Sequence, residues 1–270
     1  MKNKIIEFPT EWEELKPGEW TYLSKLFFEM IGRRGVTLVD VKREWIRFVL
    51  RNRSIKPNSS LQYYKLVHDL LGSLDWLFAE SEQQVGINFT STTNLLPVYN
   101  GLYGPADHGA DLTFGEYRNA IQMMNAYTIE HDGKYLQYLA GMLYRPKLHG
   151  LREEFNSDYM YRYIKRAARM PRFVKYTVYL WLAAFSKFLL EGTFVIDGNE
   201  VCFAEIFESR ADTKSSGKNL GLTSILYSMA ESGVFGTIDE VDKTPLLAVM
   251  MKLLNDKYKV DELKEMYKKK

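Results

Sequence analysis

The chain has little of several residue types, and each shortage excludes a kind of site. Only one of its 270 residues is cysteine, Cys202, so neither an intramolecular disulfide nor a cysteine zinc cluster can form. The four histidines, His68, His108, His131 and His149, are scattered, and no spacing places two of them on one helix face. We therefore expect no metal site, and nothing in the sequence indicates another cofactor.

Charge of one sign and long apolar runs are also scarce. The 36 basic and 34 acidic side chains nearly cancel, so no overall field attracts the protein to nucleic acid or to an anionic membrane. The first ten residues lack the apolar core of a signal peptide. The most apolar stretch, 174–190, is interrupted by Lys175 and Lys187 and is shorter than the roughly 20 residues of a membrane span. We expect a cytosolic protein in which this stretch is a buried core helix.

Hydrophobic residues make up 46% of the chain, enough to fill a core, and most of them recur at helical spacing. Thr113 and Glu116 form the pattern of a capping box, which predicts that a helix begins there. Pro146 ends the next helix, because the residue before a proline is pushed out of helical geometry. These patterns predict a mainly α, multi-helix globular protein. Further helices are expected at about 20–31, 39–51, 61–79 (with an interruption at Gly72 left open), 157–170, 171–190 and 222–233, with one opening at Pro245 and a separate last one beginning at Asp261.

Two stretches depart from the helical pattern. Asp197-Gly198 between short β-branched runs predicts one small β-hairpin near residues 193–203. Residues 85–111 lose the apolar period and accumulate glycine and proline, so they are either a functional segment or a packed irregular arm, and their apolar anchors favour the packed arm. We accordingly expect an N-terminal helical subdomain (1–84), this irregular arm (85–111) and a C-terminal helical domain (112–270).

No pattern of catalytic residues is evident. Residues 101–107 are rich in glycine, but they lack the Gly-Lys-Ser/Thr of a phosphate-binding loop. The acidic pair Glu153-Glu154 lies in an apparently exposed helix, with no sign of the desolvation that acid-base catalysis requires. We therefore expect a protein that is not an enzyme.

One local concentration of charge stands out between Tyr161 and Tyr176. This segment holds six basic residues and no acid, and five of the six can share a broad helical face. Aromatic residues are interleaved with them, as in a nucleic-acid groove. The alternatives are a solvated face balanced by acidic helices elsewhere, which we favour, and a binding site for an acidic protein. The six basic residues are Arg162, Lys165, Arg166, Arg169, Arg172 and Lys175.

Several segments, read in order, resemble an uncharacterised protein family encoded in phages and prophages of Bacteroidetes-type bacteria. The opening Pro9-x-x-Trp12-x-x-Leu15 is similar to the start of that family. Its most characteristic region is similar to residues 103–107, 112–117 and 143–146, and its closing helix and turn to residues 229–239. The hairpin around Asp197-Gly198 is not a feature of the family.

The resemblance implies a product of tail or virion genes that is reminiscent of tail assembly chaperones. We therefore expect a phage morphogenesis protein in the host cytoplasm during assembly, or in the virion, with a tape-measure or a tail/connector protein as its partner and no membrane association. The alternative is a nucleic-acid-binding phage accessory protein that uses the basic helix 161–176. The candidate partner-binding residues are Tyr103, Asp107, Arg145, Arg162, Arg166, Arg169 and Arg172.

Overall fold

A computed structural model describes residues 8–31, 33–57, 59–80, 85–196, 198–208 and 221–268. The chain is mainly helical, as predicted, and its strands form only small two-stranded sheets. The longer helices are α1 (Pro17–Met30), α2 (Leu38–Asn52), α3 (Ser60–Gly72), α4 (Phe114–Glu130), α5 (Gly133–Leu143), α6 (Met160–Ala167), α7 (Arg172–Glu191), α9 (Leu222–Ser232) and α11 (Leu246–Lys268).

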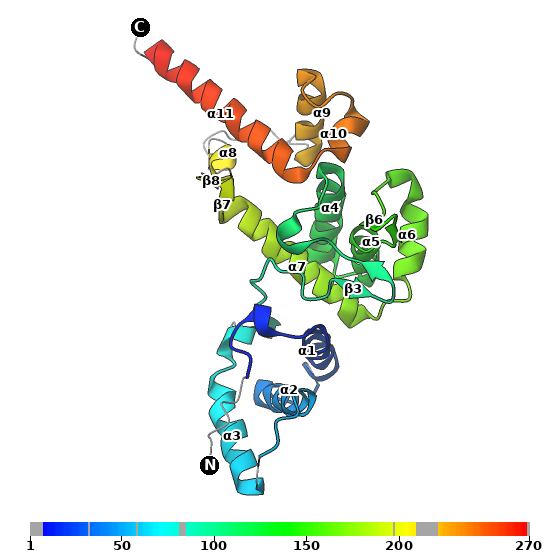
Figure 1. Cartoon of the computed structure of the whole chain (residues 1–270), viewed down its shortest axis with the longest axis vertical. Coiled ribbons are helices and arrows are strands. Elements are labelled where there is room, and N and C mark those ends of the chain that lie inside the picture. Colours follow the sequence, from blue (N-terminus) through cyan, green and yellow to red (C-terminus); the bar gives the residue numbers. More distant parts are fainter. Residues whose placement is uncertain are drawn as a thin grey trace.

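Helix α7 lies at the centre of the molecule. Helices α1, α4 and α5 all pack on it, and in Figure 1 it runs through the middle between the N-terminal helices and the C-terminal ones. The Ser24 hydroxyl of α1 donates to the Phe173 carbonyl of α7 at 2.8 Å, across 149 residues of sequence. By length and composition α7 could cross a membrane, but 61% of that window is buried inside the protein. The prediction of a buried core helix is therefore confirmed.

Aromatic side chains cluster around Trp12 in the N-terminal part of the chain. Trp12 lies within 5.3 Å, centroid to centroid, of three other rings, those of Trp20, Trp76 and Phe89.

The predicted helix 61–79 is wrong in its second half. Helix α3 ends at Gly72, and the chain continues as a 3-10 turn and the strand β1 (Phe78–Glu80), which pairs with β2 (Val85–Ile87).

The predicted hairpin is confirmed as β7 (Thr193–Ile196) and β8 (Asn199–Cys202), although Asp197 of its turn lies outside the described residues. The β1–β2 pair and two tighter hairpins were not predicted. These two are β3 (Val98–Tyr99) with β4 (Leu102–Tyr103), and β5 (Lys147–Leu148) with β6 (Leu151–Arg152). Both turn on two residues with positive φ, Asn100-Gly101 and His149-Gly150, which is the backbone that a two-residue turn requires.

The C-terminal part differs from the prediction in one respect. Residues 246–268 form the single helix α11, not two helices with a break before Asp261. Lys252 pairs with Asp256, and Lys257 with Asp261 at 2.6 Å, so side chains one turn apart stabilise the helix across the expected break. The short α10 (Ile238–Lys243) precedes α11 and packs on α4 and α9.

Residues 85–111 are packed, as favoured from the sequence. The Tyr144 hydroxyl donates to the Leu96 carbonyl at 2.6 Å, and the Trp181 indole donates to the Thr92 carbonyl at 3.0 Å. Gly104 lies so close to Tyr144 that an added Cβ would be 2.6 Å from the ring. Buried apolar residues of 12–89 and of 95–254 form one continuous cluster, so the arm joins the two parts through a shared core.

Candidate binding groove

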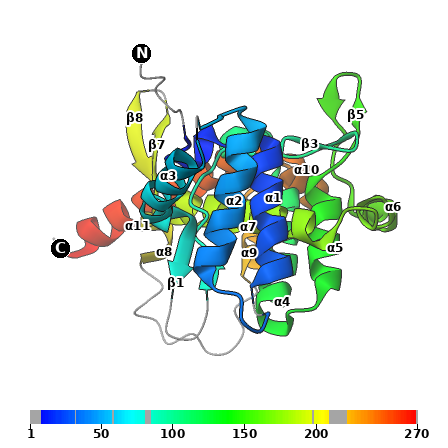
Figure 2. The same cartoon turned by 90° about the horizontal axis from the view of Figure 1, so that it is seen from below.

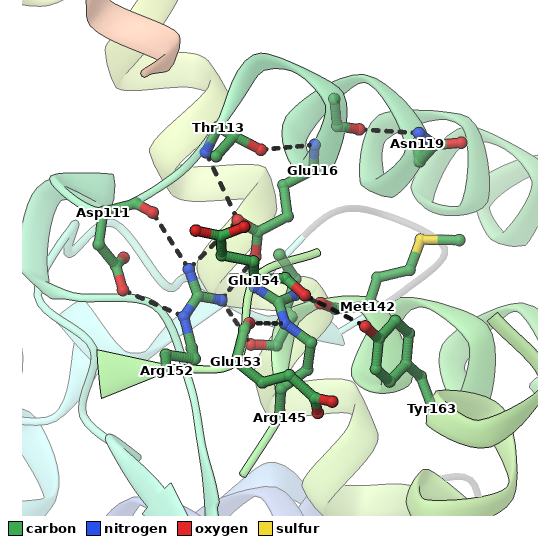
Figure 3. Close-up of polar contacts among 12 residues, drawn as sticks. Asp111, Thr113, Glu116, Asn119, Met142, Arg145, Arg152, Glu153, Glu154 and Tyr163 are labelled. Atoms are coloured by element: carbon green, nitrogen blue, oxygen red, sulfur yellow. Dashed lines mark hydrogen bonds and ion pairs between the residues drawn. The ribbon is translucent and has the colours of Figure 1, made fainter. Parts of the chain in front are cut away.

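The two sequence motifs around 112–117 and 143–146 meet in a buried ionic network. Glu116 is the N3 residue of α4 and is 1% exposed, yet it contacts two guanidinium groups (Figure 3). Its Oε1 lies 2.7 Å from Nη2 of Arg145 and 2.6 Å from Nη1 of Arg152. Arg152 also pairs with Asp111 at 3.0 Å. Two carboxylates therefore balance two arginines, which is the condition for burying such charges without a large desolvation cost.

Arg145 connects this network to the neighbouring elements. Its backbone exchanges two hydrogen bonds with Tyr103 of β4, at 2.7 and 3.1 Å. Its side chain donates to the carbonyls of Glu153 and Met142 and lies 5.9 Å from the Tyr163 ring of α6. Arg145 thus contacts both β4 and α6, and these contacts hold the two elements at a set distance from each other.

The surroundings of Arg145 affect its protonation. Burial lowers the pKa of the Arg145 guanidinium, and the negative charge of Glu116 opposes that shift without cancelling it. An arginine titrates so far above neutrality that it keeps its charge. The network is thus a fixed ionic frame, which explains the two motifs structurally without assigning them any chemistry.

A groove lies between α6 and the β3–β4 hairpin that this frame supports. Its volume is about 610 Å³. Helix α6 and the turn after it provide the basic wall, with Arg162, Lys165, Arg166 and Arg169. The β3–β4 hairpin lines it with Tyr99, Asn100 and Leu102, and Ala168 and Met170 of the turn after α6 complete the lining.

The four basic side chains differ in how strongly other groups hold them. Arg166 pairs with Glu153 at 2.9 Å, and Arg162 lies over the Tyr159 ring at 5.2 Å. Lys165 and Arg169 are exposed and have no ion-pair partner within the described part of the chain. At least two positive charges of the groove are therefore available to a ligand.

The structure separates the predicted partner-binding residues. Arg162, Arg166 and Arg169 come together in the groove. Arg145 does not reach the surface, because it is 2% exposed and bound to Glu116, and it does not line the groove. Arg172 lies over Phe28, away from the groove.

The two predicted residues of the arm also have internal roles. The Tyr103 ring lies 4.3 Å from the Lys147 ammonium, and Oδ1 of Asp107 accepts the Asn94 amide at 2.8 Å. Neither side chain lines the groove. Asp107 is exposed, whereas Tyr103 is half-buried.

The hairpin wall of the groove was not anticipated, although the sequence carries a signal for it. Asn-Gly between Val98-Tyr99 and Leu102-Tyr103 is the strongest short-range pattern of a tight hairpin. That hairpin would have placed Tyr99 and Leu102 together. Only the position of α6 opposite the hairpin depends on contacts too distant in sequence to be read locally.

No family model, curated protein or solved structure matches the chain. What the groove binds must therefore be inferred from its own residues.

Proposed function

We propose that this is a non-enzymatic phage morphogenesis protein that binds an acidic segment of a tail or virion protein in the groove between α6 and β3–β4. The observation that carries the proposal is the lining of the groove, in which four basic side chains face a mostly apolar wall. The phage setting rests on the family resemblance. A tail assembly chaperone, which shields a tape-measure protein, or a minor tail component would both use such a site.

The dimensions of the basic wall favour a short peptide. Arg162 and Arg166 are four residues apart on α6, which is about 6 Å along the helix, and Arg169 follows in the turn after it. Leu102, Ala168 and Met170 supply apolar surface beside the charges. A segment of a few residues that alternates acidic and apolar side chains could satisfy both walls, and the guanidinium groups would hold its carboxylates by charge-assisted hydrogen bonds.

Copurification tests the proposal. The tagged protein, expressed from an induced prophage or during infection, should recover a tail or virion protein, and Arg162→Glu with Arg169→Glu should lose it. The matched control is Arg33→Glu with Arg34→Glu, which reverses two exposed charges that do not line the groove. Recovery of the same protein by the groove variant would contradict the proposal.

Nucleic-acid binding is the second candidate, because Tyr99 offers a ring beside the four cations. Four phosphate contacts to a single strand predict that log K falls with log salt with a slope of about −3. Titration of a fluorescent oligonucleotide between low and physiological salt measures this slope. Lack of binding at low salt would end this candidate and leave the first one standing.

A further inference from the structure

One acidic residue, Glu153, holds a cation of the groove. Its Oε2 accepts a hydrogen bond from Nη1 of Arg166 at 2.9 Å, and its side chain is 12% exposed, against 34% for Arg166. No acidic residue lines the groove itself, and among the ion pairs of the described residues this is the only one that involves a lining cation. Glu153 therefore acts on the groove through Arg166.

The backbone of Glu153 is fixed on both sides of the carboxylate. The residue directly follows the β5–β6 hairpin, which lies on the same side of the molecule as α6 in both views (Figures 1 and 2). Its amide donates to the Pro146 carbonyl at 2.8 Å, and its carbonyl accepts Nε of Arg145 at 2.6 Å (Figure 3). Because the buried frame holds the residue at both ends, the carboxylate stays beside α6 when a ligand arrives.

The pair lowers the number of cations that a ligand can neutralise. Arg166 is already balanced, whereas Arg162, Lys165 and Arg169 have no ion-pair partner within the described ranges of the chain. A strand of nucleic acid binds mainly through its phosphates, so it loses one of at most four contacts. An acidic and apolar segment of a protein also packs on the apolar lining, so the same loss removes a smaller part of its binding free energy.

We propose that Glu153 is a specificity-determining residue of the groove. By neutralising Arg166 it lowers the affinity for nucleic acid more than the affinity for an acidic segment of a protein. The inference rests on the proposed function, because it takes that segment as the natural ligand. Specificity is a difference between two affinities, and a charge that disfavours the competitor can supply it. Removing the charge of Glu153 should therefore open the groove to single-stranded nucleic acid.

Glu153→Gln tests the proposal, because glutamine keeps an oxygen for Arg166 and removes only the charge. In fluorescence anisotropy at low salt, the variant should bind a labelled oligothymidylate about 5-fold more tightly than the wild-type chain does. Its slope of log K against log salt should be steeper by about 0.7, the contribution of one more phosphate contact. The matched control is Glu154→Gln, which makes the same change of net charge at an exposed residue with no ion-pair partner in the described part of the chain. This control should bind as the wild-type chain does, and thermal unfolding verifies that both variants are folded.

Copurification separates this inference from the proposed function. The tagged Glu153→Gln chain should recover nuclease-sensitive nucleic acid from a lysate in which the wild-type chain recovers a tail or virion protein without it. If the wild-type chain recovers that protein but Glu153→Gln binds the oligonucleotide no more tightly than Glu154→Gln does, the inference is overturned and the proposed function stands. A wild-type chain that recovers no tail or virion protein would instead overturn the proposed function, and this inference with it.

Discussion

Helices α1 and α4 begin with the same local pattern, a glycine, a glutamate and an aromatic residue, and place it in different surroundings. Glu19 and Glu116 are both N3 residues, both fully buried, and both accept the backbone amide three residues before them. Glu19 pairs with one arginine, Arg53, at 2.7 Å, whereas Glu116 pairs with two. At Glu19 this helix start makes one ion pair that joins α1 to the end of α2. At Glu116 it makes two ion pairs, which form the frame beside the groove.

Removing the charge of Glu116 should give the largest effect. Glu116→Gln leaves two buried guanidinium groups with only Asp111 to balance them, and breaking a buried pair costs about 3–5 kcal/mol. Denaturant unfolding at pH 7 measures this loss. A cost below about 1 kcal/mol would mean that the network is not the frame described above.

The corresponding change at Glu19 should cost less and should depend on pH. Burial raises the pKa of the Glu19 carboxyl, but hydrogen bonds from Arg53, the Lys16 amide and Asn52 outweigh it and hold the pKa below its usual value of 4.5. The stabilisation is therefore complete above that usual value and disappears as the pH falls through the lower folded pKa.

We expect Glu19→Gln to reduce the free energy of unfolding by about 1–3 kcal/mol at pH 7. The difference from wild type should narrow below pH 4, as urea unfolding at several pH values would show. A difference that stays constant between pH 7 and pH 3 would refute the assignment of this effect to the carboxylate.

The glycines of the two patterns offer a sharper contrast. A Cβ on Gly115 would lie 2.8 Å from the Asp242 side chain of α10, whereas a Cβ on Gly18 would have nothing within 4 Å. Gly115→Ala should thus destabilise the protein by about 1–3 kcal/mol through overpacking. Gly18→Ala should be neutral or stabilise it by up to about 1 kcal/mol. Thermal unfolding of the two variants side by side checks this, and equal melting temperatures would contradict it.

The smallest difference concerns the capping residues. The Thr113 hydroxyl accepts the Glu116 amide at 3.2 Å, so Thr113→Ala should cost about 1 kcal/mol. In α1 the Glu19 amide donates instead to the Lys16 backbone carbonyl at 2.8 Å, and Lys16→Ala keeps that carbonyl. We expect the alanine at 16 to leave the unfolding midpoint unchanged. A loss of the same size at both positions would show that the side chain of Thr113 is not the cap.

The comparison also shows what the sequence could predict. The Thr113–Glu116 box was readable because its two partners lie three residues apart, and the mainly α architecture followed from apolar periodicity. The second partner of Glu116 was not readable, because Arg152 lies 36 residues further on and is brought there by the β5–β6 turn. The same limit made Arg145 look like a surface residue.

Only one wall of the groove, the basic one, could be predicted from the sequence. The basic face of α6 follows from residue spacing, but a face becomes a groove only when the β3–β4 hairpin lies opposite, and that placement depends on the backbone pairing of Tyr103 with Arg145. The phage role and the partner remain predictions that the copurification experiment addresses, and the subdomain boundaries remain a prediction.

The packing of α1 on α7 has a consequence for biosynthesis. The Ser24 hydroxyl donates to the carbonyl of Phe173, a residue that the ribosome adds 149 residues later. At a synthesis rate of about 5–20 residues per second, this delay is roughly 7–30 s. During that time α1 can pack on α2 but not on α7, so one of its two helix contacts forms only when the second half of the chain has been made.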